Sequence, residues 1–335
     1  MQVLVTGATG FVGSHAVASM LAAGHDVRCL VRDPSRLDGA LSSTDRERVD
    51  VAVGDVLDAA SVRRALDGCD AVLHAAGAVG VSRAHSGSRD VNVEGTTHVI
   101  GQAAAAGCDP ILYTSSIVVL DDSVPTMTAE TPLGAPSGPY GRSKRDAELV
   151  ARHHQAAGDP VASFYVGGVF GPECPDVASG MSGIVGAVNQ AMPIPHGGIG
   201  TIDVRDLARL LTAALEPGRG PRRFMVGGQF LSWDDWSTLL GEVTGRPIRR
   251  IPMPSIVIRS SGRALDLLKR VRDFDYPLTH EAAVQMTSSP RCDDRVTLAE
   301  LGVDVRPVAD TMADSVRWLI AEGHIDASRA PALAP

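Results

Sequence analysis

The chain has 335 residues, 44% of them hydrophobic, which is enough for one α/β core with an appended subdomain. Its formal net charge is −8, from 31 basic and 39 acidic side chains dispersed along the sequence, and this excludes the basic surface typical of a nucleic-acid-binding protein. The five cysteines are scattered, odd in number and without the spacing of metal ligands, so we expect reduced thiols and no metal site.

The sequence contains no segment that resembles a targeting signal or a membrane span. Met1 runs directly into an apolar strand, which leaves no room for the charged region of a signal sequence. No apolar stretch approaches the ~20 residues that a membrane helix needs. We therefore expect a cytoplasmic protein without membrane insertion.

The first half of the chain alternates short apolar runs with helical patterns. Continuous apolar strands separated by helices are typical of a parallel sheet that is covered on both faces. The predicted strands are Val3–Val5, Val27–Val31, Val49–Val53, Ala71–Ala75 and Ile111–Thr114, and the predicted helices are Phe11–Ala23, Ala59–Leu66 and Val91–Ala106. Together they predict an α/β fold with a doubly wound parallel Rossmann sheet.

From about Val161 the pattern becomes irregular. The predicted elements there are the strands Val161–Tyr165, Ile202–Val204 and Phe224–Val226 and the helix Asp206–Leu215. We expect the chain to alternate between the Rossmann domain and a smaller, discontinuous α/β substrate subdomain. The predicted Rossmann domain covers residues 1–166 and about 200–228, the subdomain covers about 167–199 and 229–326, and the Ala/Pro-rich residues 327–335 form a flexible tail.

A glycine-rich loop, Thr6–Gly13, joins the first strand to the first helix. Gly7, Gly10 and Gly13 have the spacing G-x-x-G-x-x-G. Glycines allow a sharp turn and the close approach of a pyrophosphate, and the helix N-terminus offers unpaired N–H groups and a positive dipole end. With a strand before it and a helix after it, the loop predicts a dinucleotide site.

The residues after the second strand bear on cofactor choice. An NAD site usually presents an acid to the ribose 2′-hydroxyl about 20 residues beyond the glycines, but Val31 occupies this point and Arg32-Asp33-Pro34-Ser35-Arg36 follows. A guanidinium can bind a 2′-phosphate through paired hydrogen bonds. We therefore predict NADP(H) rather than NAD(H), with Arg32 as the main determinant and Arg36 assisting. In the alternative, both arginines are solvated and Asp33 partly neutralises Arg32.

The segment Tyr140-Gly141-Arg142-Ser143-Lys144 places a phenol and an ammonium on the same face of a helix. An ordinary tyrosine, with a pKa of about 10, holds its proton too firmly for efficient transfer near neutrality, and the Lys144 cation is expected to lower that pKa. Ser116 ends the fifth strand, at the carboxyl edge where ligands bind in open α/β sheets. Its hydroxyl is a candidate hydrogen-bond donor to a substrate oxygen, with Ser115 as the neighbouring alternative.

In this order, the motifs resemble the extended short-chain dehydrogenase/reductase family, including its epimerase/dehydratase-type members, over most of the chain. The matching elements are Thr6–Gly13, Gly54–Val56, His74–Ala76, Val91–Thr96, Tyr113–Ser116, Tyr140–Lys144, Val169–Pro172 and Val204–Ala208. The resemblance implies that Tyr140 is the general acid/base, that Lys144 also holds the nicotinamide ribose and that Ser116 orients the reacting carbonyl. It further implies a backbone-bracing role for Asn92.

The loop, the strand ends and the resemblance together predict the residues that contact cofactor and substrate. The expected cofactor contacts are Gly7, Thr9, Gly10, Phe11, Val12, Gly13, Arg32, Arg36, Asp55, Val56, Ala75, Ala76, Gly77, Thr114, Tyr140, Lys144, Val166, Gly168 and Val169. His74 is predicted to be a packed strand-end residue and not a catalyst. The expected substrate contacts are Val79, Ser116, Val118, Tyr140, Val169 and Met181. Such an apolar pocket suits a hydrophobic carbonyl compound, although the same side chains could form the subdomain core.

Within the family, Arg32-Asp33-Pro34 is similar to the dihydroflavonol-reductase-like and carbonyl-reductase branch, which uses NADPH. Nucleotide-sugar epimerases typically carry an acid at the place of Val31 and a late basic element that has no match here. The resemblance therefore implies NADP(H)-dependent interconversion of an aldehyde or ketone and an alcohol. A nucleotide-sugar epimerase/dehydratase is the first alternative, and a non-catalytic NADP-binding regulatory protein is the second. We expect a monomer or a homodimer formed through the helices Arg89–Ala106 and Tyr140–Ala157.

Segment 256–273 has the pattern of a basic amphipathic helix. Its apolar stripe consists of Ile256, Ser260, Ala264, Leu267, Leu268 and Val271, and the basic residues Arg259, Arg263, Lys269, Arg270 and Arg272 lie elsewhere on the helix. In one interpretation this helix packs on its own domain. In the other it is a lid over a lipophilic pocket and touches anionic membrane surfaces.

Overall fold

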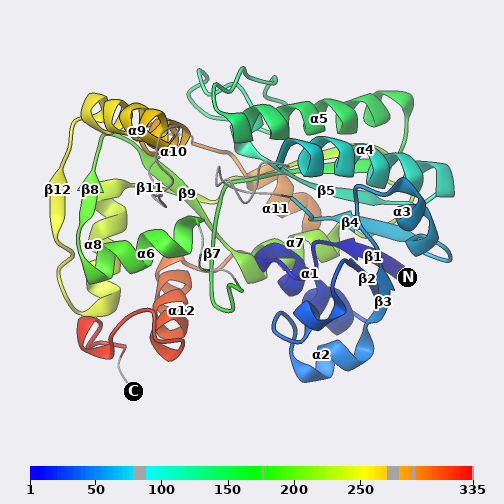
Figure 1. Cartoon of the computed structure of the whole chain (residues 1–335), viewed down its shortest axis with the longest axis horizontal. Helices are drawn as coiled ribbons and strands as arrows, with labels where there is room; N and C mark the ends of the chain where they lie inside the picture. The colour runs from blue at the N-terminus through cyan, green and yellow to red at the C-terminus, as the bar shows by residue number, and fades with distance from the viewer. Residues whose placement is uncertain (78–87, 176, 178, 270–278, 289–290, 334–335) are drawn as a thin grey trace.

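The computed structural model describes residues 1–77, 88–175, 177, 179–269, 279–288 and 291–333 (Figure 1). At its centre is a seven-stranded sheet with the strand order β10-β6-β5-β4-β1-β2-β3, in which every neighbouring pair is parallel. Its strands are β1 (Gln2–Thr6), β2 (Asp26–Val31), β3 (Asp50–Val53), β4 (Ala71–His74), β5 (Ile111–Ser116), β6 (Val161–Val166) and β10 (Arg222–Val226). The predicted doubly wound Rossmann sheet is confirmed.

Helices cover both faces of this sheet because successive strand residues point to opposite sides. In β1, Val3 and Val5 enter the core shared with α1 and α7, whereas Leu4 enters the core shared with α3, α4 and α5. Figure 1 shows these two helix layers on either side of the strands. The helices are α1 (Phe11–Ala22), α3 (Ala59–Ala65), α4 (Ser88–Ala106), α5 (Pro139–Ala157) and α7 (Val204–Ala213), and the short α2 (Ser43–Arg48) follows β2.

A second, smaller unit is built from segments that leave and re-enter the main sheet. It contains the three-stranded sheet of β11 (Gln229–Ser232), β9 (Gly198–Asp203) and β7 (Gly168–Phe170), and the parallel pair of β12 (Arg250–Pro252) and β8 (Met192–Ile194). Its helices are α6 (Ser179–Asn189), α8 (Trp233–Thr244), α9 (Ser255–Lys269), α10 (His280–Met286) and α12 (Val308–Ala321). Phe170, Met181, Trp233 and Trp236 lie in its apolar core.

Two C-terminal segments differ from the expected arrangement. Leu298 and Leu301 of α11 (Arg295–Leu301) pack against the core of the main sheet, although they lie in the range predicted for the subdomain. Residues 327–333, predicted to be part of a flexible tail, are held in place. Ala330 is fully buried and the Ala332 amide donates to the Thr244 carbonyl at 3.2 Å. A loop rich in Ala and Pro can still pack when an apolar core is within its reach.

A buried charge network joins α7 to the segment that leads into α12. The Asp206 side chain has no exposed surface and accepts from the Arg306 amide at 2.8 Å and from its guanidinium at 3.0 Å. The Arg209 guanidinium donates to the same carboxylate at 2.7 Å. Because the Asp206 charge is removed from water, it depends on these cations and this amide for its stabilisation.

Substituting this buried carboxylate tests the network. We expect Asp206→Ala to lower the free energy of unfolding by about 2 kcal/mol, because it leaves the Arg306 amide without its acceptor. The guanidinium groups lose one acceptor each, but Arg306 keeps Asp203 and Arg209 keeps the Asp304 carbonyl. The neighbouring exposed Asp304 supplies a control, since Asp304→Ala should change stability by about 0.5 kcal/mol or less. Denaturant unfolding of both variants measures the difference, and equal losses would show that the network does not carry stability.

Candidate active site

The loop between β1 and α1 is built so that no side chain fills it. Gly7 has a φ of +79°, and a Cβ on it would lie 2.6 Å from the Ala75 carbonyl carbon. A Cβ on Gly13 would lie 2.0 Å from the Gly7 oxygen. Gly10 begins α1 without a side-chain cap, and the first turn of the helix carries no acidic residue. The backbone amides and the positive dipole end of α1 therefore suit a pyrophosphate, as predicted from the sequence.

The segment after β2 contains an exposed basic side chain. Arg32 is exposed at the carboxyl end of the strand. The Asp33 carboxylate accepts from the Ser35 amide at 3.0 Å and from its hydroxyl at 2.7 Å, and caps a short 3-10 helix (Pro34–Leu37). These bonds from Ser35 lower the pKa of Asp33. The carboxylate that could have neutralised Arg32 is thus bound to Ser35.

The ends of β3 and β4 bring further predicted cofactor residues to the same edge. Asp55 accepts from the Leu57 amide at 3.0 Å, and Val56 packs beside Gly95 of α4. Beyond β4, the Ala75 amide donates to the Thr6 carbonyl at 3.1 Å and the Ala76 amide to the Thr6 hydroxyl at 3.3 Å. These bonds tie the end of β4 to the start of the glycine loop.

The three predicted catalytic side chains meet at the carboxyl edge of the sheet. Ser116 is the last residue of β5, and its hydroxyl interacts with the Tyr140 phenol at the start of α5. Lys144 lies one helical turn further along α5, where it is buried and donates from Nζ to the Thr114 carbonyl at 3.0 Å. The neighbouring Ser115 has a buried side chain, and the phenol interacts with Ser116 instead.

The electrostatics of this cluster correct one sequence-based expectation. Burial raises the pKa of Tyr140 to about 12; the Ser116 hydroxyl opposes this rise and the Glu281 carboxylate adds to it. Burial also lowers the pKa of Lys144 to about 8, against the opposing effect of Glu148. The expectation that Lys144 lowers the pKa of the phenol is therefore wrong for this structure, because desolvation dominates both groups. At neutral pH the phenol is protonated and can act as a proton donor.

A web of hydrogen bonds holds the cluster. Asn92 donates from Nδ2 to the Ser143 hydroxyl at 2.9 Å, and Ser143 donates to the Tyr140 carbonyl at 2.8 Å, so α4 braces the first turn of α5. His74 is fully buried, with its Nδ1 2.7 Å from the Thr6 hydroxyl and its Nε2 3.1 Å from that of Thr96. Burial lowers the pKa of His74 to about 3, so the ring is neutral and structural, as predicted.

The predicted substrate residues do not all line an open surface. Val79 lies outside the described residues. Met181 is buried in the subdomain core, so the alternative that it is a core residue describes its position better than substrate contact does. Val118 and Val169 are partly buried against neighbouring cores, near the ends of β5 and β6. The Val166 side chain is likewise directed into the core of the main sheet, which leaves its backbone for any cofactor contact.

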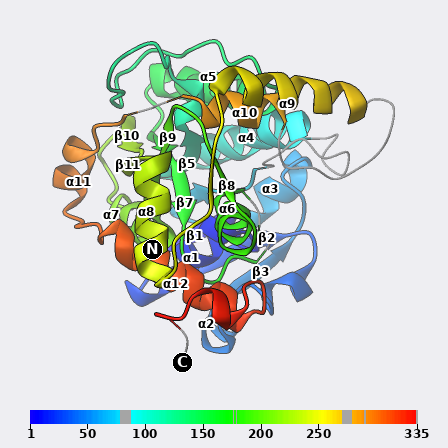
Figure 2. The same ribbon diagram turned by 90° about the vertical axis from the view of Figure 1, so that its left-hand side faces the viewer.

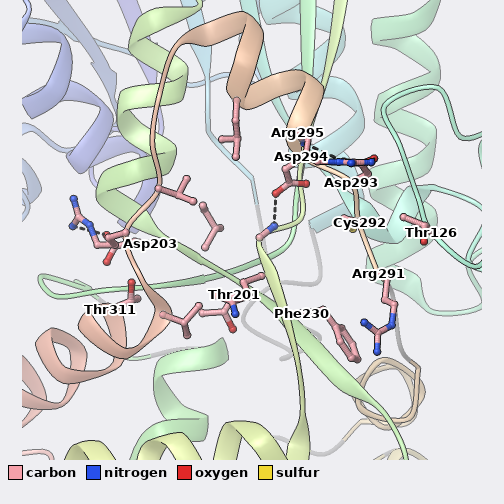
Figure 3. A pocket seen from close by; sticks show the side chains of 17 residues that line it. Thr126, Thr201, Asp203, Phe230, Arg291, Cys292, Asp293, Asp294, Arg295 and Thr311 are labelled. Carbon is pink, nitrogen blue, oxygen red and sulfur yellow. Dashed lines mark hydrogen bonds and ion pairs between the residues drawn. The ribbon is translucent and has the colours of Figure 1, made fainter.

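A cavity of about 540 Å³ lies elsewhere in the structure, between β9, β11 and the segment before α11 (Figure 3). Asp294 accepts from the Gly227 and Gly228 amides at 3.0 and 2.7 Å, and the Arg291 guanidinium lies 4.6 Å from the centre of the Phe230 ring. The catalytic residues do not line this cavity. Because Asp294 is bound by backbone amides, Asp293 by Arg295, and Arg291 lies over the Phe230 ring, we interpret it as structural.

One contact to the cluster was missed in the sequence. The Glu281 carboxylate of α10 accepts from the Tyr140 amide at 3.1 Å and from the Gly141 amide at 2.7 Å. The available signal was weak: α5 begins at Gly138 and Pro139, without a Ser, Thr, Asp or Asn at the cap position. The first amides of such a helix need a hydrogen-bond acceptor from another element, but the residues near Gly138 do not indicate which residue supplies it.

Comparison with known proteins places this site in a family. Residues 3–227 match the family described as the NAD dependent epimerase/dehydratase family. This chain belongs to that family. The extended short-chain dehydrogenase/reductase resemblance is thereby confirmed, and the chain is a nicotinamide-dinucleotide-dependent enzyme of this type. In the described residues no group of His, Cys, Asp and Glu side chains could hold a metal ion, and no described helix is both long enough and apolar enough to span a bilayer.

The individual relatives have different names. Sterol demethylase protein B of Methylococcus capsulatus is 28% identical over 348 residues, covering 97% of this chain and all of that protein. UDP-glucose 4-epimerase of Neisseria meningitidis is 29% identical over 346 residues, covering 95% of this chain and 97% of that protein. The crystal structure of UDP-glucose 4-epimerase from Bifidobacterium longum, in complex with NAD+ and UDP, has a TM-score of 0.75 at 20% identity and covers 97% of this chain and 99% of that one. At this identity the structural likeness shows the fold alone.

Proposed function

We propose that this enzyme reduces a hydrophobic aldehyde or ketone to an alcohol with NADPH, and can catalyse the reverse reaction. The proposal depends above all on the protonated Tyr140 phenol, which interacts with Ser116 at the sheet edge where the dinucleotide loop also lies. A bound nicotinamide supplies the hydride. Tyr140 then donates its proton to the carbonyl oxygen, and Ser116 holds that oxygen by a hydrogen bond. Lys144 fixes the site through the Thr114 carbonyl.

One segment without basic residues supports a substrate without a diphosphate, whereas the later part of the subdomain carries arginines such as Arg250 and Arg291. Residues 153–204, which run through β6, β7, α6, β8 and β9, contain neither lysine nor arginine. A diphosphate carries two negative charges and is usually bound by guanidinium or ammonium groups.

Arg32 supports NADP(H) as the cofactor. It is exposed directly after β2, and the adjacent carboxylate of Asp33 is bound by Ser35. A cofactor with a 2′-phosphate would gain a charge-assisted hydrogen bond here, whereas a 2′-hydroxyl would gain little. The family description and the Bifidobacterium longum complex name NAD, so the proposal of NADP(H) depends on Arg32.

A nucleotide-sugar epimerase/dehydratase is the second candidate. The family description and the Neisseria meningitidis relative favour it, and on the comparisons alone it is the better supported of the two. The same Ser116, Tyr140 and Lys144 would serve a sugar that is oxidised and reduced again in one site. The two candidates therefore share the catalytic cluster and differ in what the subdomain binds.

A substrate panel distinguishes these candidates. We expect NADPH absorbance to fall with hydrophobic aldehydes or ketones, and no interconversion of UDP-glucose and UDP-galactose. Tyr140→Phe should lower kcat by about 10²-fold or more, because the general acid is lost, while nucleotide binding persists. Ser115→Ala is the matched control for Ser116→Ala: only the latter should lower kcat strongly. Sugar turnover without carbonyl reduction would replace the first candidate by the second.

Arg32→Ser tests the cofactor assignment. We expect kcat/KM for NADPH to fall about 10- to 100-fold, as for the loss of a hydrogen bond between charged groups, while the value for NADH changes little. Arg63→Ser, at an exposed position on α3, is the control and should affect neither cofactor. Equal losses for both cofactors, or a native enzyme that does not distinguish them, would contradict the role of Arg32.

A further inference from the structure

The first turn of the catalytic helix is completed by a residue that lies far away in the sequence. The amides of Tyr140 and Gly141 precede the regular hydrogen bonds of α5 and would otherwise lack a protein acceptor. Glu281 supplies one carboxylate oxygen to each, at 3.1 and 2.7 Å. A negative charge at this end of a helix also interacts favourably with the helix dipole.

Two glycines make space for this carboxylate. A Cβ on Gly138 would lie 1.9 Å from Glu281 Cδ, and a Cβ on Gly141 would lie 3.2 Å from Glu281 Oε1. Gly138 is also the cap residue of α5 and offers no side chain of its own. The space beside Gly138 and Gly141 therefore accommodates an acceptor side chain from another element.

The element that carries Glu281 is itself anchored. Thr279 caps α10 by accepting from the Ala282 amide at 3.1 Å. The His280 amide, directly before Glu281, donates to the Asp266 carboxylate of α9 at 3.0 Å. Figure 2 shows α9 and α10 side by side next to the start of α5. The position of Glu281 is thus set by the α9–α10 pair as a whole.

We propose that Glu281 is a positioning residue for catalysis: by accepting from the Tyr140 and Gly141 amides it fixes the first turn of α5 and so holds the Tyr140 phenol beside Ser116. This proposal depends on the proposed function for the identity of the reaction. The groups that act on the phenol are Tyr113 and Ser116 from β5 and Glu281 from α10, while Lys144 of its own helix lies over the Tyr113 ring. Among them, Glu281 is the anion that favours the protonated phenol.

The test compares Glu281→Gln, Glu281→Ala and the control Glu242→Gln, which alters an exposed position on α8. The glutamine keeps an acceptor but loses the charge. Reduction requires a protonated tyrosine, so the high-pH fall of kcat in Glu281→Gln should move to lower pH, by about one unit or less for a partly exposed carboxylate. KM should change little. Glu281→Ala should lower kcat further, about threefold to tenfold below the glutamine variant, and Glu242→Gln should match the native enzyme.

A second readout does not depend on the substrate. Hydrogen exchange of the peptide that covers residues 138–144 should be faster in Glu281→Ala than in the native chain, and intermediate in Glu281→Gln. A pH profile of Glu281→Gln that superimposes on the native one would overturn the charge effect, and unchanged exchange in Glu281→Ala would overturn the positioning role. If the native enzyme reduces no carbonyl compound, the proposed function fails, while the exchange measurement and the pH profile of sugar turnover still test Glu281.

A separate observation concerns the outer face of α9. The described members of the predicted apolar stripe are exposed, with Ile256 74%, Leu267 63% and Leu268 50% exposed. The helix contacts the rest of the chain through its opposite face, where Ile258 is buried and a Cβ on Gly262 would lie 2.8 Å from the Thr279 carbonyl. The helix therefore packs on its own domain as one interpretation expected, but through this opposite face, and the predicted apolar stripe takes no part in that packing. Figures 1 and 2 both place α9 at the outer edge of the molecule.

The charges around this stripe indicate what it binds. Arg259 and Arg263 are exposed on α9 and also contact the neighbouring segment: Arg259 Nε donates to the Thr287 hydroxyl at 2.6 Å, and Arg263 Nε lies 3.3 Å from His280 Nε2. Asp266, the one acidic residue of the helix, is engaged by the His280 amide. Exposed leucines beside arginines are typical of helices that lie on anionic bilayers. We infer that this face of α9 binds an anionic lipid surface.

Co-sedimentation with vesicles tests this inference. The chain should sediment with phosphatidylcholine vesicles that contain phosphatidylglycerol and much less with phosphatidylcholine alone, and salt should reduce the binding. The double variant Leu267→Gln, Leu268→Gln should lose most of the bound fraction. Val296→Gln, which alters a residue 74% exposed on α11, is the matched control and should bind as the native chain does. Absence of binding at low salt, or a dimer by light scattering that the double variant converts to a monomer, would overturn the inference.

Discussion

The hydrogen bond from Lys144 Nζ to the Thr114 carbonyl, 3.0 Å long, joins the catalytic helix to the end of β5. It places an ammonium among buried groups, where desolvation works against its charge. The same burial raises the pKa of the Tyr140 phenol and lowers that of His74. If Tyr140 is the proposed acid, its proton transfer will depend on how tightly α4 and α5 close over the carboxyl edge of the sheet.

That closure is coupled to the cofactor loop through the strand ends. The Thr6 carbonyl and hydroxyl accept from Ala75 and Ala76, and the Thr6 hydroxyl also contacts His74. One residue at the end of β1 is thus shared by the phosphate loop and by the packing beneath Lys144. The parallel sheet brings these groups together because the carboxyl ends of all its strands lie on one edge.

The sequence was sufficient to predict the features that depend on residues close together in the chain. The strand and helix alternation, the glycine loop and the assembly of Ser116, Tyr140 and Lys144 were predicted, because each follows from periodicity, glycine geometry or a strand end. The effect of burial on the Tyr140 pKa was not predicted, since sequence spacing reveals a charged neighbour but not the loss of water. The contact of Glu281 with Tyr140 spans 141 residues and is set by tertiary packing alone. The apolar stripe of α9 was found, but its periodicity could not show which face is covered.

The family match ends at residue 227, whereas Glu281 lies beyond it and still contacts the first turn of α5. The part of the chain that the family description leaves out is thus bonded directly to the helix that carries the acid. Exchange of the C-terminal segments between relatives would therefore also change what holds the first turn of α5.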